Sequence, residues 1–175
     1  MNKVKVNIIL HRSALVRYIK EMAYIISKAS AAKAEDGIGT DYVIADILDK
    51  EADGGDGNYY LAVRSMNYAF TQCLSLVRKH IYEEQRESAS CNAHGTPETY
   101  RITLLMETQH PTTIANILQE QMNRYMALST LAEWSKLNAS QLTEIYLAEA
   151  ETVREEIRHV INPPTKAKVK GWPLW

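Results

Sequence analysis

The sequence has little phenylalanine and no long run of apolar residues. One Phe stands beside ten Tyr and three Trp among 175 residues, so most aromatic side chains carry a polar group. Such side chains suit surfaces that are partly buried or that pack against a partner. No stretch approaches the roughly 18 consecutive apolar residues that a membrane span requires. The composition therefore predicts a globular protein without a membrane segment.

An excess of charge and a disulfide framework are also missing. The chain has 20 Lys and Arg against 21 Asp and Glu, a formal net charge of −1, which gives no overall attraction to nucleic acid. Its two cysteines are Cys73, in an apolar helical pattern, and Cys91, in a polar linker. We expect free thiols in a reducing compartment. Polar residues interrupt the apolar run near the N-terminus, and no cleavage site of small residues follows, so no signal peptide is expected.

The stretch "DKEADGGDGN" (49–58) alternates acids and glycines in the manner of a calcium-binding loop. Asp49, Glu51 and Asp53 occupy positions 1, 3 and 5 of such a loop, and Gly54 follows at position 6. Position 12 requires a bidentate Glu, but this chain has Tyr60 there. We therefore interpret the stretch as a polar connection between helices, and we expect no bound metal or cofactor.

Two segments have the two-residue period of a strand, namely "KVKVNIIL" (3–10) and "YRITLLME" (100–107). Helical spacing of apolar residues predicts helices that start near Ser13 and at Pro111, and others over about 41–50, 58–86 and 140–161. The apolar stripe of the 58–86 helix comprises Val63, Met66, Phe70, Cys73, Leu74, Val77 and Ile81. The proline pair at 163–164 ends the last helix.

A linker rich in Ser, Gly, Pro and Thr separates two similar halves of the chain. It covers residues 87–99, between halves 1–86 and 100–162 that each place a strand before helices. The similarity is one of pattern, so a duplication remains a hypothesis. The predicted fold is mainly α: a single helical-bundle domain over residues 1–162, with a small two-stranded β element and an extended C-terminal arm over 163–175. Two strands alone are marginal, so they must pack on helices or pair with another subunit.

The residues that could perform chemistry do not form a complete set. Glu156 and His159 have the Glu-x-x-His spacing of di-iron bundles, which require a second such pair. The second match, Glu107 with His110, lies at a helix start, where the two side chains would not share a face. Cys91 and His94 lack a third group that would orient them. We therefore expect no catalytic and no metal site.

The C-terminal stretch "NPPTKAKVKGWPLW" (162–175) combines basic and aromatic residues in an arm that cannot continue a helix. Its three lysines are accompanied by no acid, and two tryptophans follow within four residues. Aromatic residues at such a tip are common interface anchors, so we predict a partner-binding arm. Packing of the arm on its own chain is the alternative. The predicted partner-binding residues are Lys166, Lys168, Lys170, Trp172, Leu174 and Trp175.

One segment, residues 100–137, resembles small helical proteins of phage and prophage structural-gene clusters. The shared pattern is a strand ending in Leu-Leu-Met (104–106), then His-Pro-Thr-Thr (110–113), an apolar helix with Tyr125, and a Leu-Ala-Glu-Trp turn (131–134). The first half of the chain and the tail lie outside the resemblance. The resemblance implies a virion or neck protein, such as a head-tail adaptor, rather than an enzyme.

These observations lead to two expected functions. The first is a non-enzymatic phage head-tail connector subunit, found in the virion and assembled in the host cytoplasm. Its partners would be other copies in a ring-like oligomer and neighbouring virion proteins. The alternative is a small helical regulator or nucleic-acid-binding module that uses the basic tail, with Lys3 and Lys5 in support.

Overall fold

The computed structural model describes residues 3–31, 57–87, 98–138 and 140–163. The predicted short helix at 41–50, most of the glycine-rich connection, Cys91 and the arm beyond Pro163 lie outside these residues. In chain order the elements are β1 (Val4–His11), α1 (Arg12–Ala31), α3 (Gly57–Val77), η2 (Arg78–His80), β2 (Ile81–Glu87), β3 (Thr99–Met106), α4 (Pro111–Asn138) and α5 (Ser140–Ile161). The prediction of a mainly α protein is confirmed.

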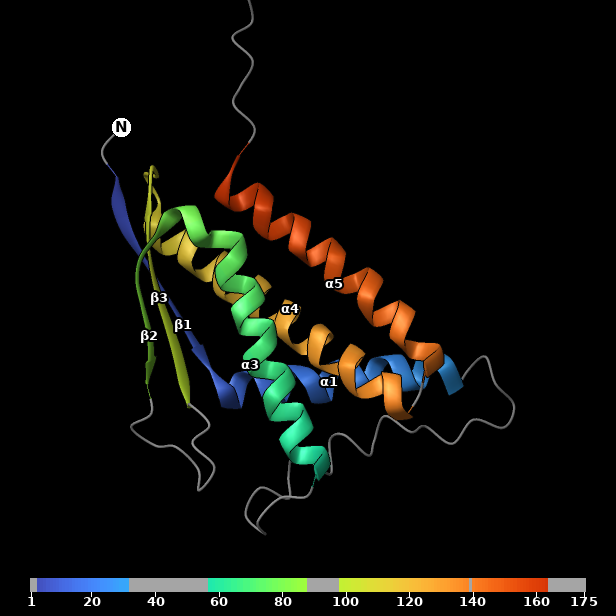
Figure 1. The fold of residues 1–175 in the computed structure, drawn as a ribbon. Coiled ribbons are helices and arrows are strands. Elements are labelled where there is room, and N and C mark those ends of the chain that lie inside the picture. The colour runs from blue at the N-terminus through green and yellow to red at the C-terminus, as the bar shows by residue number, and fades with distance from the viewer. Residues whose placement is uncertain (1–2, 32–56, 88–97, 139, 164–175) are drawn as a thin grey trace, which may run out of the picture.

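The β element is a three-stranded antiparallel sheet rather than the predicted pair of strands. The strand order is β1-β3-β2, with β3 in the centre. β1 pairs with β3 from Val4 opposite Met106 to His11 opposite Thr99. The helices form a layer on one face of this sheet (Figure 1). No described element covers the other face. The structure is therefore a layer of helices on a three-stranded sheet. The expected architecture was a helical bundle that includes a two-stranded element.

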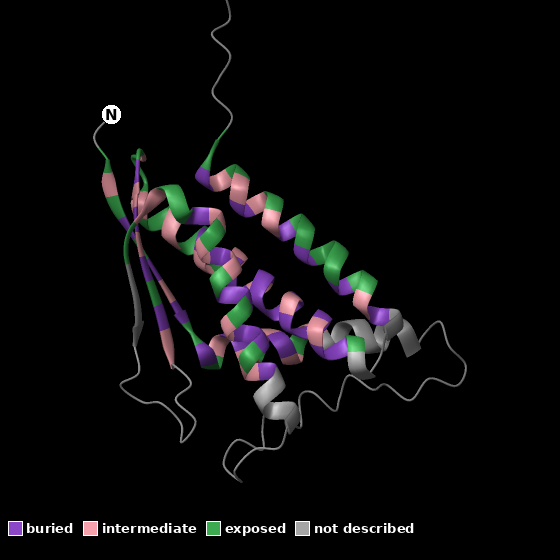
Figure 2. Ribbon diagram, viewed as in Figure 1, coloured by how far each residue is buried: buried purple, intermediate pink, exposed green. Residues whose placement is uncertain are grey.

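The two-residue period of β1 and β3 matches their burial. Side chains from both strands alternate between the helical layer and the open face. Figure 2 shows this alternation of buried and exposed positions along the strands. On the open face the Thr103 hydroxyl donates to Asn7 Oδ1 at 3.0 Å, and Lys5 Nζ lies 4.2 Å from the centre of the Tyr82 ring. The buried positions are Val6, Ile8, Leu10, Tyr100, Ile102, Leu104 and Met106.

The predicted helix over residues 58–86 was too long. α3 ends at Val77, and the 3₁₀ turn Arg78–His80 leads into β2. The sequence "IYEEQRE" of β2 contains good helix formers, but pairing with β3 overrides this weak local preference. The register shifts between Ile81 and Glu83. Half-buried Ile81, which was expected on the helical stripe, packs against the core from the sheet.

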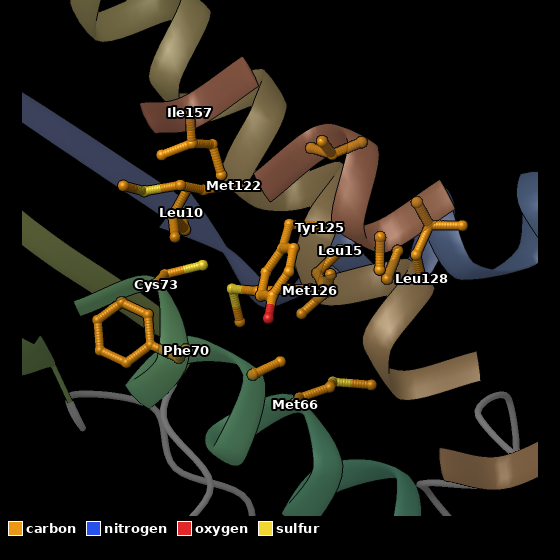
Figure 3. Close-up of a cluster of buried hydrophobic side chains, with 14 of the residues drawn as sticks. Leu10, Leu15, Met66, Phe70, Cys73, Met122, Tyr125, Met126, Leu128 and Ile157 are labelled. Atoms are coloured by element: carbon orange, nitrogen blue, oxygen red, sulfur yellow. The ribbon is translucent and has the colours of Figure 1, made fainter. Parts of the chain in front are cut away.

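Most side chains in the second half of α4 are buried. α4 contacts α1, α3, α5 and β1, and Figure 3 shows its labelled side chains between those of α3 and Ile157 of α5. The polar positions bond locally: Thr130 Oγ1 donates to the Met126 carbonyl at 2.8 Å, and Ser135 Oγ donates to that of Ala132 at 3.0 Å. Residues 131–134, expected as a turn, lie inside this helix. Its buried residues include Met122, Tyr125, Met126, Ala127, Leu128, Leu131, Ala132 and Trp134.

The starts of α1 and β3 are tied together by an ion pair between distant parts of the sequence. Arg12 Nη2 lies 2.5 Å from Glu98 Oε1, and the Arg12 backbone N–H donates to the Glu98 carbonyl at 2.9 Å. The Arg12 side chain is only 10% exposed, so this pair is better shielded from water than a surface pair. It fixes where the chain leaves β1 and enters the helical layer.

The remaining helix boundaries agree with the predictions. α4 begins at Pro111, the first helical position, where proline loses no hydrogen bond. α5 begins at Ser140 and ends at Ile161, before the proline pair. Two large apolar side chains on these helices are exposed, Ile117 at 37% and Ile145 at 47%. Ile117 contributes to the groove described below.

Two adjacent leucines of β3 provide a matched test of the two sheet faces. Leu104 is fully buried against the helices, whereas Leu105 is half-buried on the opposite side of the strand. We expect Leu104→Ala to lower the free energy of unfolding by about 2–5 kcal/mol, because it opens a cavity. Leu105→Ala should cost about 1 kcal/mol. Urea denaturation measures both changes; equal losses would contradict the assignment of faces.

Candidate functional site

A groove of about 710 Å³ lies at the end of the molecule where α5 stops. Four parts of the chain form it: the residue before β1, the η2 turn, the segment from the end of β3 into α4, and the last turn of α5. Pro163, the last described residue, lies in the groove wall. The lining comprises Lys3, Lys79, His80, Leu105, Met106, Glu107, Thr108, Ile114, Ile117, His159, Val160, Ile161, Asn162 and Pro163.

Local sequence explains why these parts meet. α5 cannot extend past the proline pair, and its end is closed by the Asn162 N–H, which donates to the Arg158 carbonyl at 2.8 Å. The chain reverses direction at the η2 turn, between α3 and β2. Ile81, directly after the turn, is already extended, with φ −64° and ψ 123°. Its three basic residues, Arg78, Lys79 and His80, follow the C-terminal end of α3, where the helix dipole favours positive charge.

The floor of the groove is apolar. Ile114 and Val160 are partly buried against the core, and Ile117 is 37% exposed. Met106 and Ile161 are buried beneath. An exposed apolar strip bordered by polar residues is typical of a surface that binds another molecule. The groove therefore offers apolar contact area that the described residues leave partly open.

The rim of the groove is basic. Lys3 and Lys79, which line the groove, are exposed, as is Arg78 beside it, and no carboxylate among the described residues forms an ion pair with them. A second hollow of about 550 Å³ adjoins the groove through Lys79, His159 and Asn162. Its wall adds Arg154, which pairs with Glu151 at 2.9 Å, and Arg158, which pairs with Glu155. Glu107 is the one acidic residue in the lining of the main groove.

Of the groups that sequence analysis considered for chemistry, Glu107 and His159 both line the main groove, while Cys91 and His94 lie outside the described residues. Among the described residues, no three His, Cys, Asp or Glu side chains could hold a metal ion. His159 lines the groove, but Glu156 does not. Cys73 is a free thiol that is completely buried between α3 and α4 (Figure 3). Burial raises the pKa of the Cys73 thiol, so it cannot serve as an exposed thiolate nucleophile.

A smaller hollow of about 200 Å³ lies between α3, α4 and α5. The Tyr125 hydroxyl points into this region and donates to Gln72 Oε1. Burial raises the pKa of the Tyr125 phenol, while a hydrogen bond with Ser129 opposes the shift. The half-exposed side chains Tyr68 and Leu147 form its mouth. Its size and mixed lining are those of an interhelical gap rather than of a ligand pocket.

The residues predicted for partner binding, Lys166, Lys168, Lys170, Trp172, Leu174 and Trp175, lie outside the described residues. The structure shows only that the chain enters the arm from the wall of the groove. Sequence reasoning missed the basic rim at η2. The signal was the run "RKH" (78–80) directly after an apolar helical stripe, but its contact with the end of α5 could not be read from one sequence.

Comparisons with protein families, with curated proteins and with solved structures find no match for the chain. None of the described helices has the length and apolar character needed to cross a bilayer.

The burial of Cys73 makes stability depend on pH. Its pKa is higher in the folded state than in the unfolded chain, where it is about 8.5, so folding holds the proton more tightly. The free energy of unfolding should therefore fall above about pH 8.5, by at most about 1.4 kcal/mol per pH unit. Urea denaturation from pH 7.5 to 9.5 measures this in a Cys91→Ser background. Cys73→Ala should flatten the profile; an unchanged slope would refute the assignment.

Proposed function

We propose that this protein is a non-enzymatic assembly component that acts through protein–protein contacts. The observation that carries the proposal is the groove at the end of α5, with its apolar floor, its basic rim and its position where the chain continues into the Lys/Trp arm. Apolar area surrounded by charge suits a protein partner, since the apolar part supplies affinity and the charges supply orientation.

The finer proposal is a phage head-tail connector subunit, either a neck or an adaptor protein. Its support is the resemblance of residues 100–137, which span β3 and most of α4. The proposed partners are other copies of the chain in a ring-like oligomer and neighbouring virion proteins. The virion is the proposed location, with assembly in the host cytoplasm. Native mass spectrometry or cryo-EM tests this: a protein that remains monomeric and joins no ring with connector partners would contradict it.

The arm over residues 163–175 is proposed to anchor a neighbouring subunit. Proline at 163, 164 and 173 prevents helix continuation and favours an extended chain. Trp172 and Trp175 would then occupy apolar pockets of the neighbour. Burial of two tryptophans can contribute several kcal/mol, at about 25 cal/mol per Å² of apolar area before ordering costs.

Deletion of residues 163–175 separates this proposal from packing of the arm on its own chain. We expect circular dichroism and the melting temperature of the monomer to be nearly unchanged, because the buried residues of the described core lie between Val6 and Ile161. Assembly should weaken, as measured by sedimentation velocity. Trp172→Ala with Trp175→Ala, which keeps all three lysines, should have the same effect. A fall of many degrees in the melting temperature of the monomer would place the arm in its own core.

A second candidate function is nucleic-acid binding. The observation in its favour is that exposed Arg78 and Lys79 lie at the same end of the molecule as the start of the lysine-containing arm. Lysine and arginine clusters bind phosphates without reading sequence, so affinity falls steeply with salt. Against it, the net charge is −1, and the arginines of α5 are paired with glutamates.

A gel-shift experiment distinguishes this candidate. If the basic end binds DNA, complexes formed at about 50 mM salt should dissociate by about 200 mM. Substitution of Lys166, Lys168 and Lys170 by Ala should abolish the shift. Lys136→Ala, at an exposed position paired with Glu133, is the control and should change nothing. Absence of any shift at low salt would eliminate nucleic-acid binding.

A further inference from the structure

The combination of floor and rim specifies the chemistry of what the groove binds. A strand of nucleic acid would satisfy Lys3 and Lys79 but would leave the apolar floor around Ile117 uncovered. A purely apolar segment would leave the basic rim without counter-charges. The complementary ligand is a peptide segment that carries acidic and apolar side chains together. The arm of the chain does not fit, because it contains three lysines and no acid between residues 163 and 174.

The chain itself contains a segment of the required kind. Residues 35–56 have eight acidic residues and a single lysine, and the apolar side chains cluster within residues 41–50, "DYVIADILDK". The apolar positions Val43, Ile44, Ile47 and Leu48 have helical spacing. The acidic residues are Glu35, Asp36, Asp41, Asp46, Asp49, Glu51, Asp53 and Asp56.

If residues 41–50 are helical, they reach the groove of their own molecule only when residues 51–56 are stretched to nearly their full length along α3, whereas the groove of a second copy places no such demand on the connection. The segment joins α3 at Gly57, and the groove contains Lys79, just beyond the other end of α3. α3 has 21 residues, a length of about 31 Å at 1.5 Å per residue. The six residues 51–56 span at most about 22 Å when fully extended. Figure 1 shows the start of α3 and the end of α5 at opposite ends of the molecule.

We propose that the groove at the end of α5 binds residues 41–50 of a second copy of this chain. The acidic segment of one copy supplies carboxylates to Lys3 and Lys79 of the next, and its apolar side chains cover the floor at Ile114 and Ile117. The contact joins different surfaces of the two copies and is therefore head-to-tail. Such contacts generate rings when the rotation closes, and filaments when it does not. The inference rests on the proposed assembly function and identifies the contact that would produce it.

The test uses charge reversal on each side of the contact in the full chain. The groove variant is Lys3→Glu with Lys79→Glu, and the segment variant is Asp46→Lys with Asp49→Lys. Each alone should weaken self-association about tenfold or more in sedimentation velocity, because like charges then face each other. An equimolar mixture should recover association, since each variant carries the complement of the other. Arg64→Glu, an exposed reversal on α3, is the control and should associate as the unmodified protein does.

A labelled peptide of residues 35–56 provides an independent measurement. It should bind the unmodified protein and bind the groove variant at least about tenfold more weakly. The inference would be overturned if either double variant associated as strongly as the unmodified protein, or if the mixture of the two did not recover association. Either outcome would leave an assembly role intact. Tighter binding of single-stranded DNA of equal charge than of the peptide would also overturn it. If the unmodified protein forms no oligomer at all, the proposed function fails together with the inference.

Discussion

The burial of the second half of α4 is the constraint on which the rest of the packing depends. From Met122 to Ser135 most of its side chains are buried, and the helix contacts α1, α3, α5 and β1. A helix that is buried over most of its circumference needs several partners, because no single partner can cover it. The three other described helices and the sheet are therefore arranged around α4. The small side chains Ala127 and Ala132 permit close approach of its neighbours.

The same constraint explains why one end of the molecule is open. The first turns of α4 extend beyond the core, so Ile114 and Ile117 are covered only in part. α5 follows α4 back to this end and stops at Ile161, which leaves apolar area exposed between the two helices and the end of β3. Basic residues of η2 lie beside it. The core thus ends in a groove with an apolar floor and a basic rim, and this groove is the observation on which the proposed assembly function rests.

Local signals predicted those elements whose boundaries are set by the chain itself. The period of β1 and β3, the start of α4 at Pro111 and the end of α5 before Pro163 were all found, because alternation and proline act within a few residues. β2 was missed for the opposite reason. Its sequence "IYEEQRE" has no strand period, and it becomes a strand only because β3 offers an unpaired edge. The arm residues from Lys166 to Trp175 stay a prediction.

The sequence by itself determined the mainly helical composition, two of the three strands and the chemical character of each segment: the acidic stretch at 35–56, the basic run at 78–80 and the Lys/Trp arm. Only the tertiary structure decided which of these segments share a surface. Lys3, Lys79 and His159 are far apart in the sequence, yet they border one groove. The physical reason is that the hydrophobic effect depends on the apolar area removed from water and not on distance along the sequence. The packing around α4 therefore brings these residues together.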